Sequence, residues 1–254
     1  MKILFISPHP DDVEFACGNT QIQLVKNKHE VYLVCMTADE YGTSQDNFKG
    51  ERISKIRRNE QKRASRITKI HQLNWMGFID GHVKITKENM KYIEDFIKKI
   101  NPDVIFAPDP FQPVDFHPDH LKTGFMIISI LKKWKNPPLT LLFYTLSPNF
   151  HIACKSRKLA KKAFSKHKSQ FFDSKHIILF NSIFQLIHGF RMRNTWFAEA
   201  YRIIDFKKKF KKKSLKDRIK YTLFYLIMKI ALPRPNLYKP IPEKLNLKEF
   251  RNLN

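Results

Sequence analysis

The chain alternates short apolar runs with longer stretches of helical periodicity, and this alternation is what most restricts its fold. Strands are predicted at residues 2–7, 31–36, 72–76, 103–107 and 139–145. Helices are predicted between them, near residues 14–28, 51–70, 86–100 and 118–134. Strands that alternate with helices form a parallel sheet covered on both faces. The sequence therefore predicts an α/β fold: a Rossmann-like, mostly parallel sheet with helices on both faces.

Two short strings of histidine and aspartate directly follow predicted strands or their loops. Pro8-His9-Pro10-Asp11-Asp12 follows the strand at 2–7, and His117-Pro118-Asp119-His120 comes after the strand at 103–107 and a proline-rich loop. Proline prevents a strand from continuing, so both strings lie beyond carboxyl ends of strands. In an open α/β sheet, sites form at those ends. We therefore predict one site divided between the two strings.

The residue types indicate a metal. Catalytic zinc sites use three protein ligands from His and Asp/Glu and leave a position for water. His9 and Asp12, three residues apart across a proline-stiffened turn, can point at one position, and His120 can close the site from the second string. We predict that these three residues hold Zn²⁺, and another divalent metal would suit the same ligands.

The remaining groups of the two strings suit acid and base chemistry. Asp11 can take a proton from the attacking water, and His117 can stabilise the oxyanion and then protonate a leaving amine. Asp119 can orient His117 or raise its pKa. Either string alone is more typical of a turn, because aspartate caps helices and proline starts turns. Their joint occurrence at strand ends favours the metal site.

At these residues the chain resembles the PIG-L deacetylase family, also called LmbE-like, over most of residues 1–206. Further motifs in the family's order carry the resemblance: a helix start Cys17-Gly18-Asn19-Thr20 with Asn19 in place of a glycine, Arg57-x-x-Glu60, Asp80-Gly81, a His167-x-Ser169-Gln170 helix, and Ala198-Glu199-Ala200-Tyr201. The resemblance implies zinc-dependent hydrolysis of the acetamide of an N-acetylglucosamine-containing glycoconjugate, which releases acetate and a free amino sugar.

The resemblance also implies roles for single residues. It repeats the zinc ligands His9, Asp12 and His120, the base Asp11 and the acid or oxyanion stabiliser His117. It makes Arg57 and Asp80 the candidates for substrate binding. Both have plainer interpretations, because Arg57 lies in a basic run that suits a solvated helix face, and Asp80 before glycine suits a turn. For His167 a capping or packing role is favoured over a catalytic one.

Positive charge is concentrated in the last hundred residues. Residues 155–254 hold 26 Lys and Arg against 6 Asp and Glu, whereas residues 1–154 hold 21 against 17. We predict a deacetylase domain at 1–206 and a basic, amphipathic, helical extension at 207–254. A lysine cluster beside the apolar run 221–232 suits a helix lying on an anionic membrane. Packing on the domain, an oligomer contact and, least favoured, nucleic-acid binding are the alternatives.

Other features bear on where the protein works. Its three cysteines, Cys17, Cys35 and Cys154, have no paired spacing, which favours a reducing, cytoplasmic setting. No signal peptide and no stretch of ~18 apolar residues is visible. We expect a cytoplasmic enzyme, peripheral to the inner face of the membrane if the basic extension binds it.

Two other functions stay open. The same chemistry permits a zinc amidase that removes a larger acyl group. A non-catalytic, membrane-associated sugar-binding protein with the same fold is the alternative from another class, although such a protein needs neither Asp11 nor His117. The absence of a G-x-G-x-x-G motif after the first strand disfavours a dinucleotide enzyme.

Overall fold

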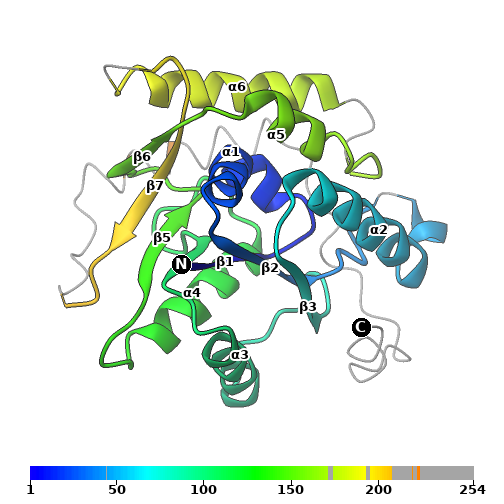
Figure 1. The fold of residues 1–254 in the computed structure, drawn as a ribbon. Coiled ribbons are helices and arrows are strands. Elements are labelled where there is room, and N and C mark those ends of the chain that lie inside the picture. Colours follow the sequence, from blue (N-terminus) through cyan, green and yellow to red (C-terminus); the bar gives the residue numbers. More distant parts are fainter. Residues whose placement is uncertain (44, 171–173, 193–194, 208–218, 220–221, 224–254) are drawn as a thin grey trace.

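A computed structural model of the chain shows one mixed sheet of seven strands between two layers of helices (Figure 1). The structure describes residues 1–43, 45–170, 174–192, 195–207, 219 and 222–223. The strands are β1 (Lys2–Ser7), β2 (Glu30–Thr37), β3 (Gln72–Phe78), β4 (Val104–Pro108), β5 (Leu139–Phe143), β6 (Phe150–Ala153) and β7 (Ala198–Ile204). The helices are α1 (Asp12–Lys26), α2 (Glu51–Thr68), α3 (Lys87–Ile100), α4 (Pro118–Leu131), α5 (Arg157–Phe164) and α6 (Ser174–Gly189), with a short 3-10 helix at Asp46–Phe48.

The strand order places the two strings side by side. The order is β3-β2-β1-β4-β5-β7-β6, and the pairs among the first five strands are parallel. Ile3 pairs with Val104 and Phe5 with Phe106, so β1 and β4 are neighbours in register. The chain leaves β1 toward β2 on one side and reaches β4 on the other, which makes the gap between their carboxyl ends a topological switch point. The predicted Rossmann-like sheet is confirmed.

Alternating side chains of the central strands build two cores. On β1, Leu4 and Ile6 face one core, which α3 and α4 cover, and Ile3 and Phe5 face the other. In Figure 1, α3 and α4 lie below the sheet, and α1, α2, α5 and α6 lie above it. A strand with both faces buried needs a continuous apolar run instead of polar alternation, which is the pattern of residues 3–6.

The C-terminal part of the sheet was not predicted. β7 runs antiparallel to both β5 and β6, so the sheet is mixed at this edge. Its sequence, Ala-Glu-Ala-Tyr-Arg-Ile-Ile, carries polar groups in a strand whose residues are largely buried. The predicted basic helical extension at 207–254 lies almost entirely outside the described residues.

Two motif positions differ from the prediction. Cys17 to Thr20 lie in the middle of α1, which begins at Asp12, so the predicted helix start at these residues is wrong. His167 to Gln170 follow the end of α5 at Phe164 and form turns, so the predicted helix at this motif is also wrong. In both cases the motif's side chains serve tertiary contacts that a helix boundary does not require.

Glu199 ties β7 to α1. Its carboxylate accepts hydrogen bonds from the backbone N–H groups of Asn19 (2.9 Å) and Thr20 (2.8 Å). The Tyr201 hydroxyl donates to the same carboxylate at 3.0 Å, and the Asn19 amide Nδ2 donates to it at 3.2 Å. Glu199 is 3% exposed, so removal of its carboxylate leaves several buried donors without an acceptor.

We predict that Glu199→Ala lowers the free energy of unfolding by about 3 kcal/mol, since unpaired buried donors cost ~1–3 kcal/mol each. Urea denaturation measures the change. Glu51→Ala is the control, because Glu51 is exposed and its ion pair with Lys55 lies at the surface, and such pairs contribute less than ~1 kcal/mol. Equal losses for the two variants would contradict the assigned role of Glu199.

Candidate metal centre

The first string forms a tight turn between β1 and α1. β1 ends at Ser7 and α1 begins at Asp12, so only four residues connect them. Asp11 has a φ of 94°, in the left-handed region that non-glycine residues rarely adopt. Backbone strain of this kind persists where the surrounding structure holds it and is concentrated at functional sites. The turn presents His9, Asp11 and Asp12 at the carboxyl end of β1.

Three side-chain atoms from the two strings converge on one point. His9 Nδ1 lies 3.1 Å from His120 Nε2, His120 Nε2 lies 3.2 Å from Asp12 Oδ2, and Asp12 Oδ2 lies 3.5 Å from His9 Nδ1. Ligands of a tetrahedral zinc at bond lengths of ~2.0–2.1 Å lie ~3.3 Å apart. The distances among the three predicted ligands therefore match a tetrahedral metal centre.

The charges around this point favour a cation. Burial lowers the pKa of His9, but hydrogen bonds to Asp119, Asp12 and Asp80 outweigh burial and raise that pKa well above its ordinary value. Burial also lowers the pKa of His120, and the charges of Asp12 and Asp115 raise it overall. Both imidazoles thus lie where positive charge is stabilised. A divalent cation would supply that charge, and the donor set fits zinc.

Carboxylates hold the outer nitrogens of both candidate histidine ligands. His9 Nε2 lies 3.0 Å from Asp80 Oδ1 and 3.5 Å from Asp119 Oδ2. His120 Nδ1 lies 3.4 Å from Asp115 Oδ2. A carboxylate at this nitrogen fixes the tautomer of a metal-binding histidine and raises its basicity. The contact places Asp80 beside the candidate ligand His9. Substrate binding by Asp80 stays a prediction.

Asp119 joins the two halves of the site. Its Oδ2 accepts a hydrogen bond from the Gly81 backbone at 2.7 Å, and its Oδ1 accepts one from Val83 at 3.3 Å. Its own backbone N–H donates to His117 Nδ1 at 3.2 Å, with His117 as the N-cap of α4. Asp119 thus orients His117 through its backbone and His9 through its side chain.

Asp11 and His117 flank the three candidate ligands and have strongly shifted pKa values. Burial, followed by the charge of Asp12, raises the pKa of Asp11 to about 7. Burial, followed by the charges of His9 and His120, lowers the pKa of His117 to about 4. The His117 ring meets the His9 ring edge-on, with centroids 4.6 Å apart. The His117 ring thus lies beside the candidate ligand His9, and Asp11 directly precedes the candidate ligand Asp12 in the turn.

Arg57 is buried, so its interpretation as part of a solvated helix face is wrong. It is 2% exposed and points inward from α2. Its guanidinium pairs with Asp39, donates to the Gly42 carbonyl at 2.6 Å and donates to Gln170. Because Arg57 lies within a run of basic residues, the sequence did not indicate that its side chain points inward. Substrate binding by Arg57 stays a prediction.

Sequence reasoning missed several residues around the site. Asp39 and Glu40 follow β2 at the same edge of the sheet, and two acids after a predicted strand could have indicated them. His9, Asp39 and Asp80 each offer a potential ligand atom within 4.8 Å of one another, as do His9, His117 and His120. Arg57 already neutralises Asp39, which makes the first of these sets a poor cation site.

A buried chain of polar side chains links Asp11 to His167. The Asp11 backbone donates to Gln61 Oε1 at 3.1 Å, and Gln61 Nε2 donates to Glu14 Oε1 at 2.7 Å. His167 Nε2 lies 3.6 Å from Glu14 Oε2. His167 is 2% exposed and is connected to the metal-site turn through this chain. A packing role for His167 stays a prediction.

Tyr144 is a further residue that the sequence did not single out. It follows β5, has a φ of 53°, and its hydroxyl lies 3.3 Å from both the backbone oxygen and Oδ1 of Asp12. Its ring stacks on His120 with an interplanar angle of 8° and centroids 5.6 Å apart. One side chain thus contacts two candidate ligands. Its position at the carboxyl end of a predicted strand could have indicated that Tyr144 lies near the site.

A model of the family described as PIG-L, GlcNAc-PI de-N-acetylase, matches residues 4–131, which include both strings. The chain belongs to the PIG-L family. The match covers β1 to α4, the part of the fold that supplies all three converging atoms.

The chain is similar to two proteins described as diacetylchitobiose deacetylases. A diacetylchitobiose deacetylase from Thermococcus kodakarensis is 28% identical over 187 residues, which span 67% of this chain and 70% of that protein. The structure of N,N'-diacetylchitobiose deacetylase from Pyrococcus horikoshii in complex with its inhibitor MPG has a TM-score of 0.76 at 28% identity and covers 81% of this chain and 84% of that chain. The conserved protein TT1542 from Thermus thermophilus has a TM-score of 0.68 at 21% identity, covers 84% of this chain and 98% of that chain, and shows the fold alone.

We predict that Tyr144→Phe weakens zinc binding by about tenfold, the lower end of the effect of removing a group that orients a ligand. Competition with a chromophoric chelator measures the affinity. Tyr201→Phe is the matched control, because it removes another buried hydroxyl whose partners are Thr20 and Glu199. If both variants bind zinc like the wild type, Tyr144 does not position the ligands.

Asp80→Ala is expected to weaken zinc binding by ~10–100-fold, because His9 loses the carboxylate at its outer nitrogen. The same chelator competition measures this effect without any substrate. Unchanged zinc affinity together with a raised KM would instead support the predicted role of Asp80 in substrate binding.

Proposed function

We propose that this protein is a metal-dependent N-deacetylase that hydrolyses the acetamide of an N-acetylglucosamine-containing glycoconjugate, with zinc at His9, Asp12 and His120. The convergence of these three ligand atoms, flanked by Asp11 and His117, carries the proposal. Membership in the PIG-L family and the likeness to two diacetylchitobiose deacetylases support the reaction class.

Asp11 and His117 have different proposed roles in the reaction. Zinc, when bound, lowers the pKa of water to ~7 and polarises a carbonyl. Asp11 then takes the proton of the water that attacks the acetamide carbon. The C–N bond breaks, the amine leaves with a proton, and acetate is the second product. Asp11 holds the proton taken from the water and gives it to the amine nitrogen as the C–N bond breaks.

His117 is best suited to stabilise the oxyanion by a hydrogen bond. Its Nδ1 accepts the backbone N–H of Asp119, so the neutral ring carries its proton on Nε2. An Nε2–H group donates a hydrogen bond to an oxygen on which negative charge develops. The same hydrogen bond at Nδ1 disfavours the doubly protonated ring that donation of a proton to the amine requires. Of its two predicted roles, we therefore propose oxyanion stabilisation.

Substitution of single residues tests the assignment. Asp11→Ala and His117→Ala are each expected to lower kcat at least ~10²-fold and to retain zinc, because neither residue is a proposed ligand. His120→Ala is expected to lose zinc. Metal analysis and acetate release are the two measurements, and His71→Ala is the control, since His71 is exposed and contacts Tyr32. Full zinc retention in His120→Ala would contradict the assignment of His120 as a zinc ligand.

The substrate is found by measuring acetate release from free, nucleotide-linked and lipid-linked N-acetylglucosamine. Turnover of one of these identifies the glycoconjugate. Release of a larger acid from N-acyl conjugates without acetate release would favour the zinc amidase. Sugar binding without turnover of any conjugate would favour the non-catalytic binding protein. Arg57 and Asp80 remain the proposed substrate-binding residues.

The division into a deacetylase domain at 1–206 and an extension at 207–254 also remains a proposal. The predicted membrane contact of residues 207–232 lies largely outside the described residues. In the part of the chain that is described, no helix combines the length and apolar character needed to cross a bilayer.

A further inference from the structure

The outward face of α6 is apolar. Leu179, Ile183 and Ile187 are 59%, 47% and 49% exposed, and Phe180 beside them is 46% exposed. These positions follow the i, i+4, i+8 spacing that places side chains on one face of a helix. Figure 1 shows α6 as the outermost element of its layer, with α5 and α1 between it and the sheet.

The exposed apolar surface continues past the end of α6. Phe190 is 67% exposed and Trp196 is 69% exposed, and their rings meet edge-on with centroids 5.9 Å apart. Together with Leu179, Phe180, Ile183 and Ile187, they form a continuous set that we call the α6 apolar face. Aromatic side chains with one apolar and one polar end are favoured at the boundary between lipid and water.

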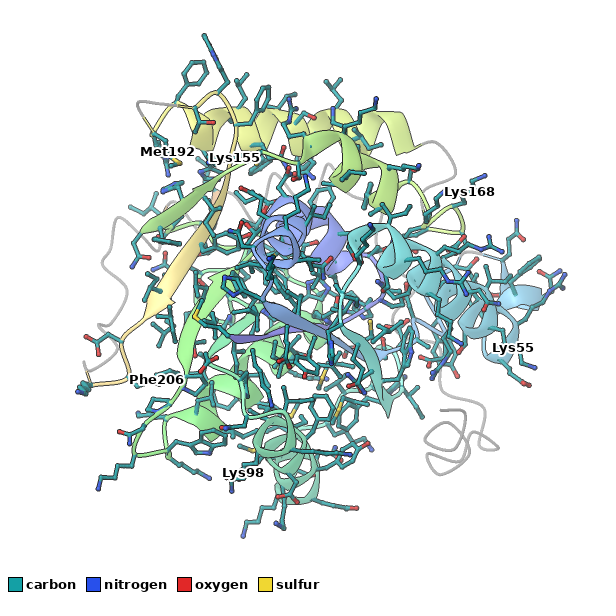
Figure 2. All side chains as sticks on the ribbon, in the orientation of Figure 1. Lys55, Lys98, Lys155, Lys168, Met192 and Phe206 are labelled. Atoms are coloured by element: carbon teal, nitrogen blue, oxygen red, sulfur yellow. The ribbon has the colours of Figure 1, made fainter. Side chains whose placement is uncertain are left out.

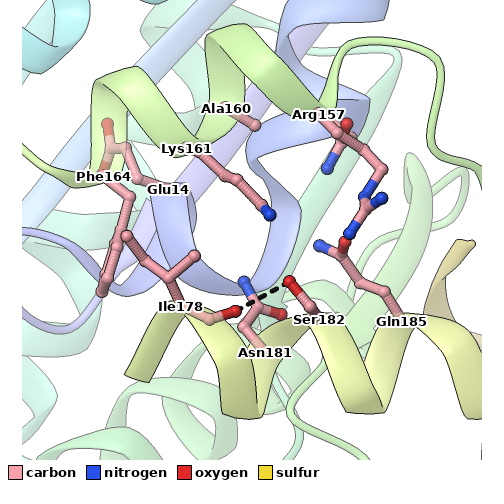
Figure 3. A pocket seen from close by; sticks show the side chains of 10 residues that line it. Glu14, Arg157, Ala160, Lys161, Phe164, Ile178, Asn181, Ser182 and Gln185 are labelled. Atoms are coloured by element: carbon pink, nitrogen blue, oxygen red, sulfur yellow. Dashed lines mark hydrogen bonds between the residues drawn. The ribbon is translucent and has the colours of Figure 1, made fainter. Parts of the chain in front are cut away.

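The inward face of α6 carries three polar side chains beside Ile178. Asn181, Ser182 and Gln185 point toward α1 and α5 and line a pocket there together with Arg157 (Figure 3). Asn181 Nδ2 donates to the backbone oxygen of Phe15 in α1 at 2.9 Å, and Gln185 is 7% exposed. None of the predicted site residues lines this pocket.

The amphipathic character of α6 is therefore reversed. A helix on the surface of a protein in water normally turns its apolar side to the core and its polar side to solvent. A contiguous exposed apolar patch marks a surface that meets a partner. The partner of this face is consequently apolar, or has an apolar layer within reach of the side chains.

Positive charge is abundant in the segment that carries the α6 apolar face. Residues 155–198, which contain α5 and α6, hold ten Lys and Arg and a single acid, Asp173. Lys155, Lys158, Lys162 and Lys168 are exposed, and Figure 2 shows Lys155 and Lys168 at the same end of the molecule as α6. The partner must therefore combine an apolar layer with negative charge at its surface.

Charge separates the three occupants that this face can have. Residues 208–254 hold 14 Lys and Arg against 3 acids, so this segment would bring like charge against the basic surroundings of α6. A second copy of the chain would bring the same basic surroundings face to face. Only a surface of anionic lipid offers both an apolar layer and opposite charge.

We propose that the α6 apolar face inserts at the surface of an anionic lipid bilayer, with the exposed lysines of residues 155–168 near the headgroups. α6 lies in the plane of the interface and does not cross it. Gln170, which precedes the start of α6 at Ser174 by four residues in the sequence, contacts Arg57 near the metal point.

Vesicle flotation with the full-length protein tests the proposal. The vesicles are phosphatidylcholine with and without phosphatidylglycerol, and the variant combines Leu179→Ser, Ile183→Ser and Ile187→Ser. The matched control combines Ile85→Ser, Phe125→Ser and Leu139→Ser, which are 44%, 47% and 49% exposed in other parts of the molecule. Circular dichroism and zinc content establish that both variants are folded.

The α6 variant is expected to bind anionic vesicles at least ~10-fold more weakly than the wild type, and the control variant to bind equally well. Wild-type binding is expected to fall on neutral vesicles and at high salt. Equal vesicle binding by the α6 variant and wild type would overturn the proposal. A wild-type dimer that the α6 variant converts to a monomer, without vesicle binding, would assign the face to a second copy instead. Flotation involves no turnover, so its outcome is independent of the proposed deacetylation.

Discussion

The parallel pairing of β1 with β4 is the contact on which the candidate site depends. Nearly a hundred residues of chain separate these strands, yet their carboxyl ends lie next to each other at the point where the strand order reverses. The turn after β1 supplies His9 and Asp12, and the N-terminus of α4 supplies His120. A change in strand order would leave each string as an ordinary proline-containing turn.

The gathering of charges at this edge is costly unless each charge is paired. Buried carboxylates and imidazoles lose their hydration, and only nearby opposite charges and hydrogen bonds offset that loss. The site meets this requirement by placing Asp80, Asp119 and Asp115 at the outer nitrogens of the two histidines. The same carboxylates leave one nitrogen of each ring facing Asp12, and this arrangement makes the point suitable for a cation.

Prediction from the sequence was most successful for the first 131 residues. There the strands are continuous apolar runs, and the helices carry clear periodicity and end signals such as Asn101-Pro102. It was least successful after Phe143. β7 carries the buried Glu199, and α6 turns its polar side inward, so neither element follows the hydrophobic pattern on which such prediction relies. Arg57 was misjudged for the same reason, since its partners Asp39 and Gln170 come from other segments of the chain.

The sequence by itself determined the fold class, the two strings and the set of residue types that a metal hydrolase requires. These follow from local periodicity and from the chemistry of neighbouring side chains. Only the tertiary structure decided which atoms converge, that Asp80 and Tyr144 contact the candidate ligands, and that α6 presents apolar side chains to its surroundings. Those facts depend on strand order and on the direction in which each helix faces, which are set by packing between segments distant in the chain.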